Sequence, residues 1–439
     1  MMKRICVFLF LSFCTSQVYS QTKITKYHFE GEGKIKEQYY VLENDSSIID
    51  GEYLAYDVEG NLSVKGVYLK GIRNGEFQNY YPNGVVQRTT FYVNGLKEGV
   101  TRVYDDQNNL VQEGTFLRDT LTGILSTFFP EGKIKNTTEF KKGKPNGWVK
   151  EYYPNEKLKE EISYVDGKQD GPNKTYYESG QLKSDINYSN GVLDGYIRSY
   201  YANGQLNNET YQKNGSKEGF YKQYYENGQL KTSGNYSNGV LSGNIISYYS
   251  SGAIEQNLNI VNGMKLGENK TFYENGKTKT LIDYSNREKD RLIKEYDSVG
   301  NLTAEKSFIE NKKFGTWKYY FPKNILKISE PYVQGRTEGV RTTYDDQQRI
   351  IREESYVKGK KHGTETVYHE NGQPSEIFNY KLGVLSGLYQ KRSKNNQLEA
   401  HGEYSRGKKN GDWEYYDKKG KVEKTENYKY GKLLNSDEP

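Results

Sequence analysis

The chain has 439 residues, and only 34% of them are apolar, although it contains 43 tyrosines and 45 glycines. The low apolar content excludes a thick aliphatic core, whereas aromatic residues and glycine favour thin, tightly turned β-structure. The many aromatic residues and the nearly balanced charges also exclude a disordered chain. The net charge is +6, and Lys3 and Arg4 contribute two of those charges, so the remaining excess is too weak to predict nucleic-acid binding.

Residues 1–20 have the features of an export signal. Lys3 and Arg4 precede a short apolar run, and Ser20 is a small residue just before Gln21, the expected cleavage point. The apolar run is far shorter than a bilayer-spanning helix, so a cleaved signal is favoured over an uncleaved anchor, and no transmembrane span is expected in the mature chain.

Both cysteines of the chain, Cys6 and Cys14, lie inside this signal. The mature protein is therefore expected to lack disulfides, thiolate metal sites and cysteine nucleophiles. Phe13 stands before Cys14, where lipoprotein processing needs a small residue, so lipidation is not expected. The predicted location is the periplasm, the cell envelope or the medium.

Residues 21–50 are expected to form a degenerate copy of the repeat that follows. Glu32-Gly33-Lys34-Ile35 matches Glu131-Gly132-Lys133-Ile134 inside that repeat array. A degenerate first unit is suited to covering the first edge of a sheet, so this segment is predicted to be an N-terminal cap.

A glycine recurs every 24 residues from Gly51 to Gly411, and only Arg291 interrupts the series. Sixteen repeats of 24 residues therefore tile residues 51–434 without insertion or deletion, and 435–439 form a C-terminal tail whose charges and proline discourage edge pairing. A constant period of this length is typical of solenoids and hairpin arrays, whose function lies on an extended surface. Positions within a repeat are counted below from this glycine, which is position 0.

Two turns alternate within each repeat, as residues 219–242 illustrate. Asn227-Gly228 lies between two runs of strand-forming residues, which is a strong hairpin signal. Proline at position 7 of other repeats, such as Pro82, favours a type I turn followed by a left-handed glycine. This three-residue loop is expected to pair position 6 with 10 and position 5 with 11. Asn238-Gly239 is expected to reverse the chain again before the next repeat. The sequence thus predicts an all-β, solenoid-like array of tandem antiparallel β-hairpins that forms one long twisted sheet.

Position 5 is aromatic in 15 of 16 repeats, position 11 is aliphatic in 14, and position 17 is aromatic in 14. These three positions are expected to share one face, which would be the buried one. Position 2 is also apolar in many repeats, including Phe77, Trp317 and Trp413, yet strict alternation sets it on the face opposite position 5. Either both faces carry aromatic residues, or a bulge between positions 2 and 5 turns both inward. The bulge is favoured, because the frequently basic position 3 would otherwise point into the core.

Tyr-Tyr-Glu-Asn-Gly-Gln-Leu-Lys at residues 224–231, followed by Tyr236, Asn238 and Gly239, resembles the MORN-repeat superfamily, and within it the bacterial variant often labelled antitoxin-like. The resemblance covers nearly the whole mature chain in constant phase. It implies hairpin arrays that serve as scaffolds or binding surfaces, some of them near membranes, and thus the possibility of peripheral membrane association. The antitoxin label implies toxin neutralisation for some relatives, although the export signal and sixteen repeats of this chain depart from a cytoplasmic antitoxin.

Catalytic groups are sparse, and we expect a protein that is not an enzyme and that holds no cofactor and no metal. Among four histidines only His369 lies at a recurrent position, where it replaces the tyrosine of position 6, and no catalytic or metal-binding spacing occurs. Asp105-Asp106 and Asp345-Asp346 occupy hairpin turns, where aspartate bonds to the local backbone, so they are interpreted as turn residues rather than metal ligands.

One set of residues is singled out as a candidate binding surface. In four successive repeats position 3 is basic and position 6 is tyrosine, which could form parallel ladders of cations and aromatic rings suited to sugar rings, acidic polymers or proteins. The alternative is that tyrosine simply fits strands and lysine keeps the surface soluble. The residues of this Lys/Tyr stripe are Lys150, Tyr153, Lys174, Tyr177, Arg198, Tyr201, Lys222 and Tyr225.

Two functional hypotheses follow, and a third has less support from the sequence. The first is an exported, non-catalytic scaffold that binds a protein partner at the bacterial cell envelope or outside it. The second is a module that binds carbohydrate or cell-wall polysaccharide through the Lys/Tyr stripe. The third, an antitoxin or immunity protein, depends on the resemblance alone.

Overall fold

The computed structural model describes residues 21–29 and 33–438. The predicted export signal at residues 1–20 and the last residue of the tail, Pro439, lie outside the described residues. The described chain is almost entirely β-structure, and its only helical segment is the short 3-10 turn η1 (Pro322–Asn324).

The strands fall into two compact units. The first comprises residues up to Gly204 with 212–215, and the second comprises 205–211 with the residues from Ser216 onwards. The strands of the first unit are β1 (Gln21–Tyr27), β2 (Ile35–Leu42), β3 (Asp45–Tyr56), β4 (Leu62–Leu69), β5 (Ile72–Arg73), β6 (Gly75–Tyr80), β7 (Val86–Val93), β8 (Leu96–Lys97), β9 (Gly99–Tyr104), β10 (Leu110–Leu117), β11 (Thr120–Phe128), β12 (Ile134–Lys141), β13 (Lys144–Tyr152), β14 (Leu158–Val165), β15 (Lys168–Tyr176), β16 (Leu182–Ser189) and β17 (Val192–Tyr200). The strand β18 (Leu206–Lys213) is divided between the units. The strands of the second unit are β19 (Ser216–Tyr224), β20 (Leu230–Ser237), β21 (Val240–Tyr248), β22 (Ile254–Val261), β23 (Met264–Lys265), β24 (Gly267–Phe272), β25 (Thr278–Ser285), β26 (Asp290–Tyr296), β27 (Leu302–Ile309), β28 (Lys312–Phe321), β29 (Ile325–Val333), β30 (Arg336–Thr337), β31 (Gly339–Tyr344), β32 (Ile350–Val357), β33 (Lys360–Tyr368), β34 (Pro374–Lys381), β35 (Val384–Leu385), β36 (Gly387–Arg392), β37 (Leu398–Ser405), β38 (Lys408–Tyr416), β39 (Val422–Lys429) and β40 (Lys432–Asp437).

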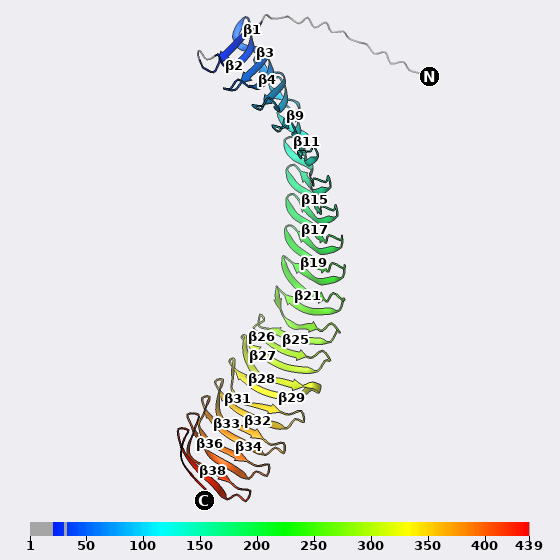
Figure 1. Cartoon of the computed structure of the whole chain (residues 1–439). Helices are drawn as coiled ribbons and strands as arrows, with labels where there is room; N and C mark the ends of the chain where they lie inside the picture. The colour runs from blue at the N-terminus through cyan, green and yellow to red at the C-terminus, as the bar shows by residue number, and fades with distance from the viewer. Residues whose placement is uncertain (1–20, 30–32, 439) are drawn as a thin grey trace, which may run out of the picture. The chain divides into compact units, whose positions relative to one another are not determined.

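Within each unit the hairpins follow one another in chain order, and neighbouring strands pair antiparallel (Figure 1). The prediction of an all-β array of tandem antiparallel hairpins is therefore confirmed. Residues 21–50 supply β1, β2 and the start of β3, and β2 pairs with both of its neighbours, as a cap on the first repeat requires. At the other end β40 runs to Asp437, which pairs with Thr425, so the last strand extends into the predicted tail.

The first turn of the repeat has the predicted geometry. The amide of Tyr225 donates to the carbonyl of Gln229 at 2.8 Å, and the amide of Gly228 donates to the carbonyl of Tyr225 at 2.9 Å. Gly228 has a φ of +83°, which an L-residue adopts only with strain. Tyr224 pairs with Leu230, which confirms the predicted pairing of positions 5 and 11.

The second turn is a two-residue loop. Ser237 pairs with Val240, which leaves Asn238 and Gly239 as the loop, with φ values of +49° and +79°. Two consecutive positive φ values define the type I′ turn, whose twist matches that of the strands it joins. Asparagine and glycine recur here because they tolerate this conformation best.

The leading glycine lies where the register of the second strand pair shifts. Asn235 pairs with Ser242 but Ser233 pairs with Ile246, so β21 carries two more residues than the matching stretch of β20. Gly243 lies inside this bulge with a φ of +82°. The 24-residue recurrence of glycine therefore marks a repeated backbone bulge that needs a left-handed residue.

Arg291, which breaks the glycine series, shows what replaces the bulge when glycine is missing. Strands β25 and β26 pair without any register shift. Ser285 pairs with Asp290, so the two additional residues lie in a longer hairpin loop, several of whose residues have positive φ. The residue at position 0 thus decides whether the extra length enters the strand or the turn.

The first hairpin contains a one-residue register shift that sequence reasoning did not anticipate. Tyr224 pairs with Leu230, but Gln223 pairs with Thr232, so Lys231 at position 12 is an extra residue in the second strand. A one-residue slip turns every later side chain to the other face of the sheet. Position 17 therefore lies on the face opposite to that of positions 5 and 11. The expectation that positions 5, 11 and 17 share one buried face is wrong for position 17.

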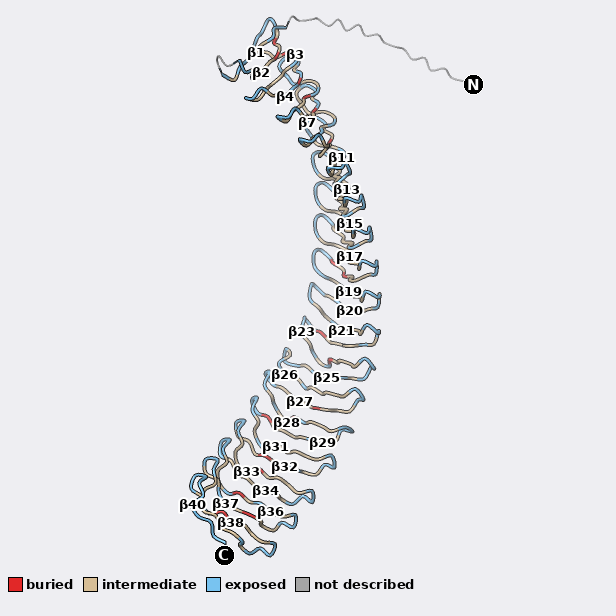
Figure 2. The backbone as a smooth tube through the Cα atoms, viewed as in Figure 1, coloured by how far each residue is buried: buried red, intermediate tan, exposed pale blue. Residues whose placement is uncertain are grey.

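Positions 2, 4, 13, 15, 17 and 22 share the other face, called here the core face. The ring centroid of Trp317 at position 2 lies 4.9 Å from Tyr332 and 5.1 Å from Phe308, both at position 17. Trp413 is only 2% exposed, and fully buried residues are few and scattered along the strands (Figure 2). The register of β19 is regular through positions 2, 3 and 4, so the favoured bulge between positions 2 and 5 is wrong, and aromatic residues lie on both faces.

Glycine at position 15 makes room for the large side chain at position 2 of the next repeat. A Cβ added at Gly402 would overlap the ring of Trp413, and one added at Gly66 would overlap the ring of Phe77. Each large side chain therefore fills a space that glycine leaves in the neighbouring strand. This pairing of large and small residues gives a thin sheet some close-packed core.

Candidate functional site

The cations of the Lys/Tyr stripe lie on the face opposite the core face, together with the residues at position 1. The ammonium of Lys150 lies 5.8 Å from the ring centroid of Trp148, and that of Lys222 lies 5.3 Å from the ring of Phe220. The guanidinium of Arg198 is closer still, 4.3 Å from the ring of Tyr196. The aromatic partner of the position 3 cation is therefore the residue two places before it, and not the tyrosine of position 6.

The tyrosines of the stripe lie at the first turn and connect neighbouring repeats. The hydroxyl of Tyr153 donates to the carbonyl of Tyr176 at 2.9 Å, and that of Tyr177 donates to the carbonyl of Tyr200 at 2.8 Å. Tyr225 makes the same bond to Tyr248 at 2.7 Å. These hydroxyls therefore have a structural role that spans one repeat to the next.

A different cation accompanies the tyrosines. The ammonium groups of Lys183 and Lys231, both at the extra position 12, lie 5.7 Å and 5.5 Å from the ring centroids of Tyr177 and Tyr225. The structure thus separates the stripe into two sets, with position 3 beside position 1 and position 6 beside position 12. In the repeat of Lys174 position 1 is Pro172, and in the repeat of Tyr201 position 12 is Asn207, so the two pairings do not run through all four repeats.

The turn interpretations of the other singled-out residues are confirmed. A carboxylate oxygen of Asp105 accepts hydrogen bonds from the amides of Gln107 and Asn109 at 3.0 and 2.8 Å. The hydrogen bond from the Asn109 side chain, followed by these backbone bonds, lowers the pKa of Asp105. Nε2 of His369 lies 2.8 Å from the carbonyl oxygen of Arg392, so this histidine takes over the tyrosine contact between repeats. Within residues 21–29 and 33–438, no group of three or more His, Cys, Asp and Glu side chains has a metal-binding arrangement.

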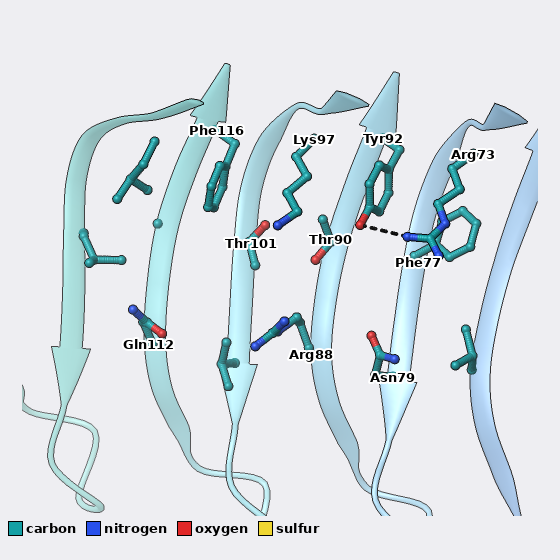
Figure 3. A pocket seen from close by; sticks show the side chains of 15 residues that line it. Arg73, Phe77, Asn79, Arg88, Thr90, Tyr92, Lys97, Thr101, Gln112 and Phe116 are labelled. Carbon is teal, nitrogen blue, oxygen red and sulfur yellow. Dashed lines mark hydrogen bonds between the residues drawn. The ribbon is translucent and has the colours of Figure 1, made fainter. Parts of the chain in front are cut away.

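A cavity of about 450 Å³ lies on the core face of the first unit, between β4 and β11 (Figure 3). We call it the core-face cleft. Its lining combines aromatic rings (Phe77, Tyr92, Phe116) with small polar side chains such as Thr90 and Thr101. Neighbouring strands present these side chains on the same side of the sheet (Figure 3). More of the lining surface is polar than apolar, and polar groups beside aromatic rings can orient a bound ligand.

The core-face cleft is positively charged. Arg73, Arg88 and Lys97 line it, and the residues that line it include no aspartate or glutamate. The Arg73 guanidinium lies 5.1 Å from the ring of Phe77, and its Nη1 lies 3.4 Å from the hydroxyl oxygen of Tyr92. A hydrogen bond to Tyr68 raises the pKa of Arg73, so this side chain stays charged throughout the physiological range.

Sequence reasoning missed the core-face cleft because its residues come from eight strands, β4 to β11, whose alignment depends on the bulges. A signal was nevertheless present: Arg88 at position 13 and Lys97 at position 22 are basic, while Thr90 and Thr101 carry no charge. That pattern becomes meaningful only when the register places those positions beside one another on one face.

Comparison with known proteins adds the family. The model of the MORN repeat variant matches eight segments, each of which covers most of one repeat: 73–94, 145–166, 169–190, 193–214, 217–238, 265–286, 361–382 and 409–430. No curated protein sequence matches the chain. Among the described residues, no helix is long and apolar enough to cross a membrane.

Solved structures give only distant similarity. The chain is 12% identical to a chain of the Photorhabdus luminescens Tc holotoxin pore, with 93% of this chain and 28% of that chain covered and a TM-score of 0.14. It is 11% identical to a chain of TcdB2-TccC3, with 92% and 28% covered and a TM-score of 0.15. The chain thus spans less than a third of either neighbour, and these TM-scores are too low to indicate a shared fold. The eight repeat matches are specific, and they show that the chain belongs to the MORN repeat variant family.

Proposed function

We propose that this protein is an exported, non-catalytic scaffold that binds a protein partner at the cell envelope or outside the cell. Repeats of this family generally mediate interactions with proteins or membranes. The observation that carries the proposal is the core-face cleft, an open cavity with aromatic walls and three cations on a sheet that otherwise repeats a regular pattern. Aromatic residues and arginine are the side chains that contribute most to protein interfaces.

Export is tested separately from binding. The full-length chain should be processed before Gln21 and recovered outside the cytoplasm, as N-terminal sequencing of the fractionated protein would show. Recovery of the unprocessed chain in the cytoplasm alone would contradict the exported scaffold.

Binding is tested by cross-linking from the core-face cleft. Both native cysteines lie in residues 1–20, so single cysteines can carry a thiol-linked photo-cross-linker in the processed chain. Thr101→Cys places the probe in the cleft, and Val100→Cys places it on the opposite face one residue away. The proposal expects the same protein adduct repeatedly from Thr101→Cys; if bulk lipid or glycan is all that is captured, the protein-binding function is wrong.

A second candidate function is polysaccharide binding through the stripe within the first unit. Its support is the row of turn tyrosines, with Lys183 held 5.7 Å from the ring of Tyr177. Tyr177→Ala with Tyr201→Ala should abolish retention on isolated cell-wall or capsular polysaccharide. Tyr177→Phe with Tyr201→Phe keeps the rings but removes the hydroxyl that bonds to the next repeat, so these variants should still be retained. Equal retention of the alanine variants would exclude this site.

A further inference from the structure

Two cations of the core-face cleft lack a protein carboxylate. Among the described residues, no Asp or Glu oxygen lies within ion-pair distance of the Arg88 guanidinium or the Lys97 ammonium. Thr90, between the two cations, is only 5% exposed and Lys97 is half-buried, whereas the Arg88 side chain is exposed. Unneutralised charges beside a partly desolvated surface favour an anion that can take the missing place.

The second unit contains a stretch of sequence that can be compared directly with the core-face cleft. Arg352, Tyr356 and Lys361 occupy the same repeat positions as Arg88, Tyr92 and Lys97, and the sheet register is the same. Arg352 pairs with Val367 as Arg88 pairs with Val103, and Tyr356 pairs with Lys361 as Tyr92 pairs with Lys97. The two stretches therefore share these three residues in the same backbone frame, although Arg341 stands where the cleft has Phe77 and Thr337 stands where it has Arg73.

In that second stretch two glutamates neutralise the cations. The Lys361 ammonium lies 2.7 Å from a carboxylate oxygen of Glu354 and 2.7 Å from one of Glu365. A guanidinium nitrogen of Arg352 lies 3.7 Å from the other oxygen of Glu365. Burial alone would raise the pKa of Glu354, but the hydrogen bond and the charge of Lys361, together with the charges of Arg341 and Arg352, outweigh burial and lower that pKa.

The core-face cleft has threonine where the second stretch has glutamate. Thr90 stands at the position of Glu354, and Thr101 stands at the position of Glu365. These replacements remove two carboxylates and leave Arg88 and Lys97 in place. The space between them is part of the cavity of about 450 Å³.

We propose that the core-face cleft binds an acidic segment of a protein partner, whose carboxylate side chains take the places that Glu354 and Glu365 fill in the second unit. Phe116, which lies beside the cations and is half-buried, receives an apolar side chain of the same segment, whereas Phe77 is only 5% exposed and forms the wall on the other side. The Lys97 ammonium, 5.1 Å from the ring of Phe116, is positioned to bond a carboxylate while its stem packs on that ring. This inference rests on the proposed scaffold function and names the chemistry of the partner.

The test uses the processed full chain and a labelled peptide, Glu-Phe-Glu-Phe-Glu, with Gln-Phe-Gln-Phe-Gln as its neutral counterpart. Thr90→Glu with Thr101→Glu rebuilds the ion pairs to Arg88 and Lys97. Glu354 also pairs with Arg341, whose place in the cleft is taken by Phe77, so the fold of this variant is checked by circular dichroism, which should match that of the unaltered chain. Thr89→Glu with Val100→Glu adds the same charge on the opposite face and is the matched control. Arg88→Gln with Lys97→Gln removes the cations instead.

The acidic peptide should bind the unaltered chain, and its affinity should fall about tenfold or more in Thr90→Glu with Thr101→Glu and in Arg88→Gln with Lys97→Gln. The matched control should bind the peptide within about twofold of the unaltered chain. Any weaker binding caused by its added negative charge at long range should disappear when salt is added, because salt screens such interactions. Equal binding of the neutral peptide, or equal loss in the matched control, would overturn the inference. Binding of phosphatidylserine vesicles, but not of the peptide, through the same cations would overturn it as well.

The inference and the scaffold function fail in different ways. If the envelope cross-link from Thr101→Cys persists when Thr90 is replaced by glutamate, a partner binds but not through carboxylates. If the acidic peptide binds while no adduct forms in the envelope, the cleft chemistry is right and the scaffold function is wrong.

Discussion

At the scale of single residues, glycine is the residue that makes the repeat possible. Position 0 needs a positive φ because the strand bulges there, and Arg291 shows that the bulge disappears when glycine does. The constant 24-residue spacing of glycine therefore reflects the backbone conformation that the bulge requires, and it gives only indirect information about function.

The cost of losing that conformation can be measured at Gly243, whose φ is +82° and around which an added Cβ would meet no atom within 4 Å. Gly243→Ala should lower the local free energy of unfolding by about 1–2 kcal/mol through backbone strain alone. Hydrogen exchange of the β20 and β21 amides would report the change. No loss of protection would show that the bulge adopts another conformation at no cost.

Gly402 carries a different constraint, because the ring of Trp413 fills the space that a side chain would take. Gly402→Ala should destabilise β37 and β38 by about 1–3 kcal/mol through overpacking. The same substitution combined with Trp413→Leu should cost less than the sum of the two single changes, since the smaller side chain relieves the overlap. Strict additivity in a denaturation experiment would contradict this packing.

At the scale of strands and hairpins, the sequence predicted the turns and the local pairing correctly. Asn-Gly signals located both loops, and Tyr224 pairs with Leu230 as expected. Turn chemistry is local, so a few residues determine it. The same holds for Asp105, whose carboxylate bonds to its own turn.

The faces of the sheet could not be predicted in the same way. A single extra residue, Lys231 in the example repeat, reverses the side on which Tyr236 lies. A bulge of this kind has no strong sequence signature, because many residues tolerate it. The core-face cleft depended on that reversal.

The last hairpin should be sensitive to acid. Glu426 accepts hydrogen bonds from Lys424 and from the hydroxyls of Tyr415 and Tyr428, and these bonds lower its pKa from 4.5 to about 2. A carboxyl whose pKa is lower in the folded state stabilises fully above its unfolded pKa and loses that effect as the pH falls. The strands β38 to β40 should therefore lose stability between about pH 4.5 and pH 2.

This prediction can be followed by the fluorescence of Trp413 after the other two tryptophans are replaced by phenylalanine. Glu426→Gln should be less stable near neutral pH, where the carboxylate contributes fully, but should show a weaker dependence on acid. An identical acid profile in the two proteins would show that Glu426 does not stabilise this hairpin.

At the scale of the whole molecule, the repeats act as internal comparisons for one another. Positions that are filled by ion pairs in one repeat are left incomplete in another, as the threonines at 90 and 101 show beside the glutamates at 354 and 365. The core-face cleft differs from the stretch around Glu354 and Glu365 by these two residues, and it lies wholly within the first unit.

Cross-linking in the envelope from two adjacent residues tests the central claim most directly. Thr101 lines the core-face cleft, whereas Val100 is exposed on the opposite face. A cysteine-borne probe at residue 101 should form a recurring protein adduct, and the probe at residue 100 should not. An adduct from residue 100 alone, or equal adducts from both, would contradict the assignment of partner binding to the core-face cleft.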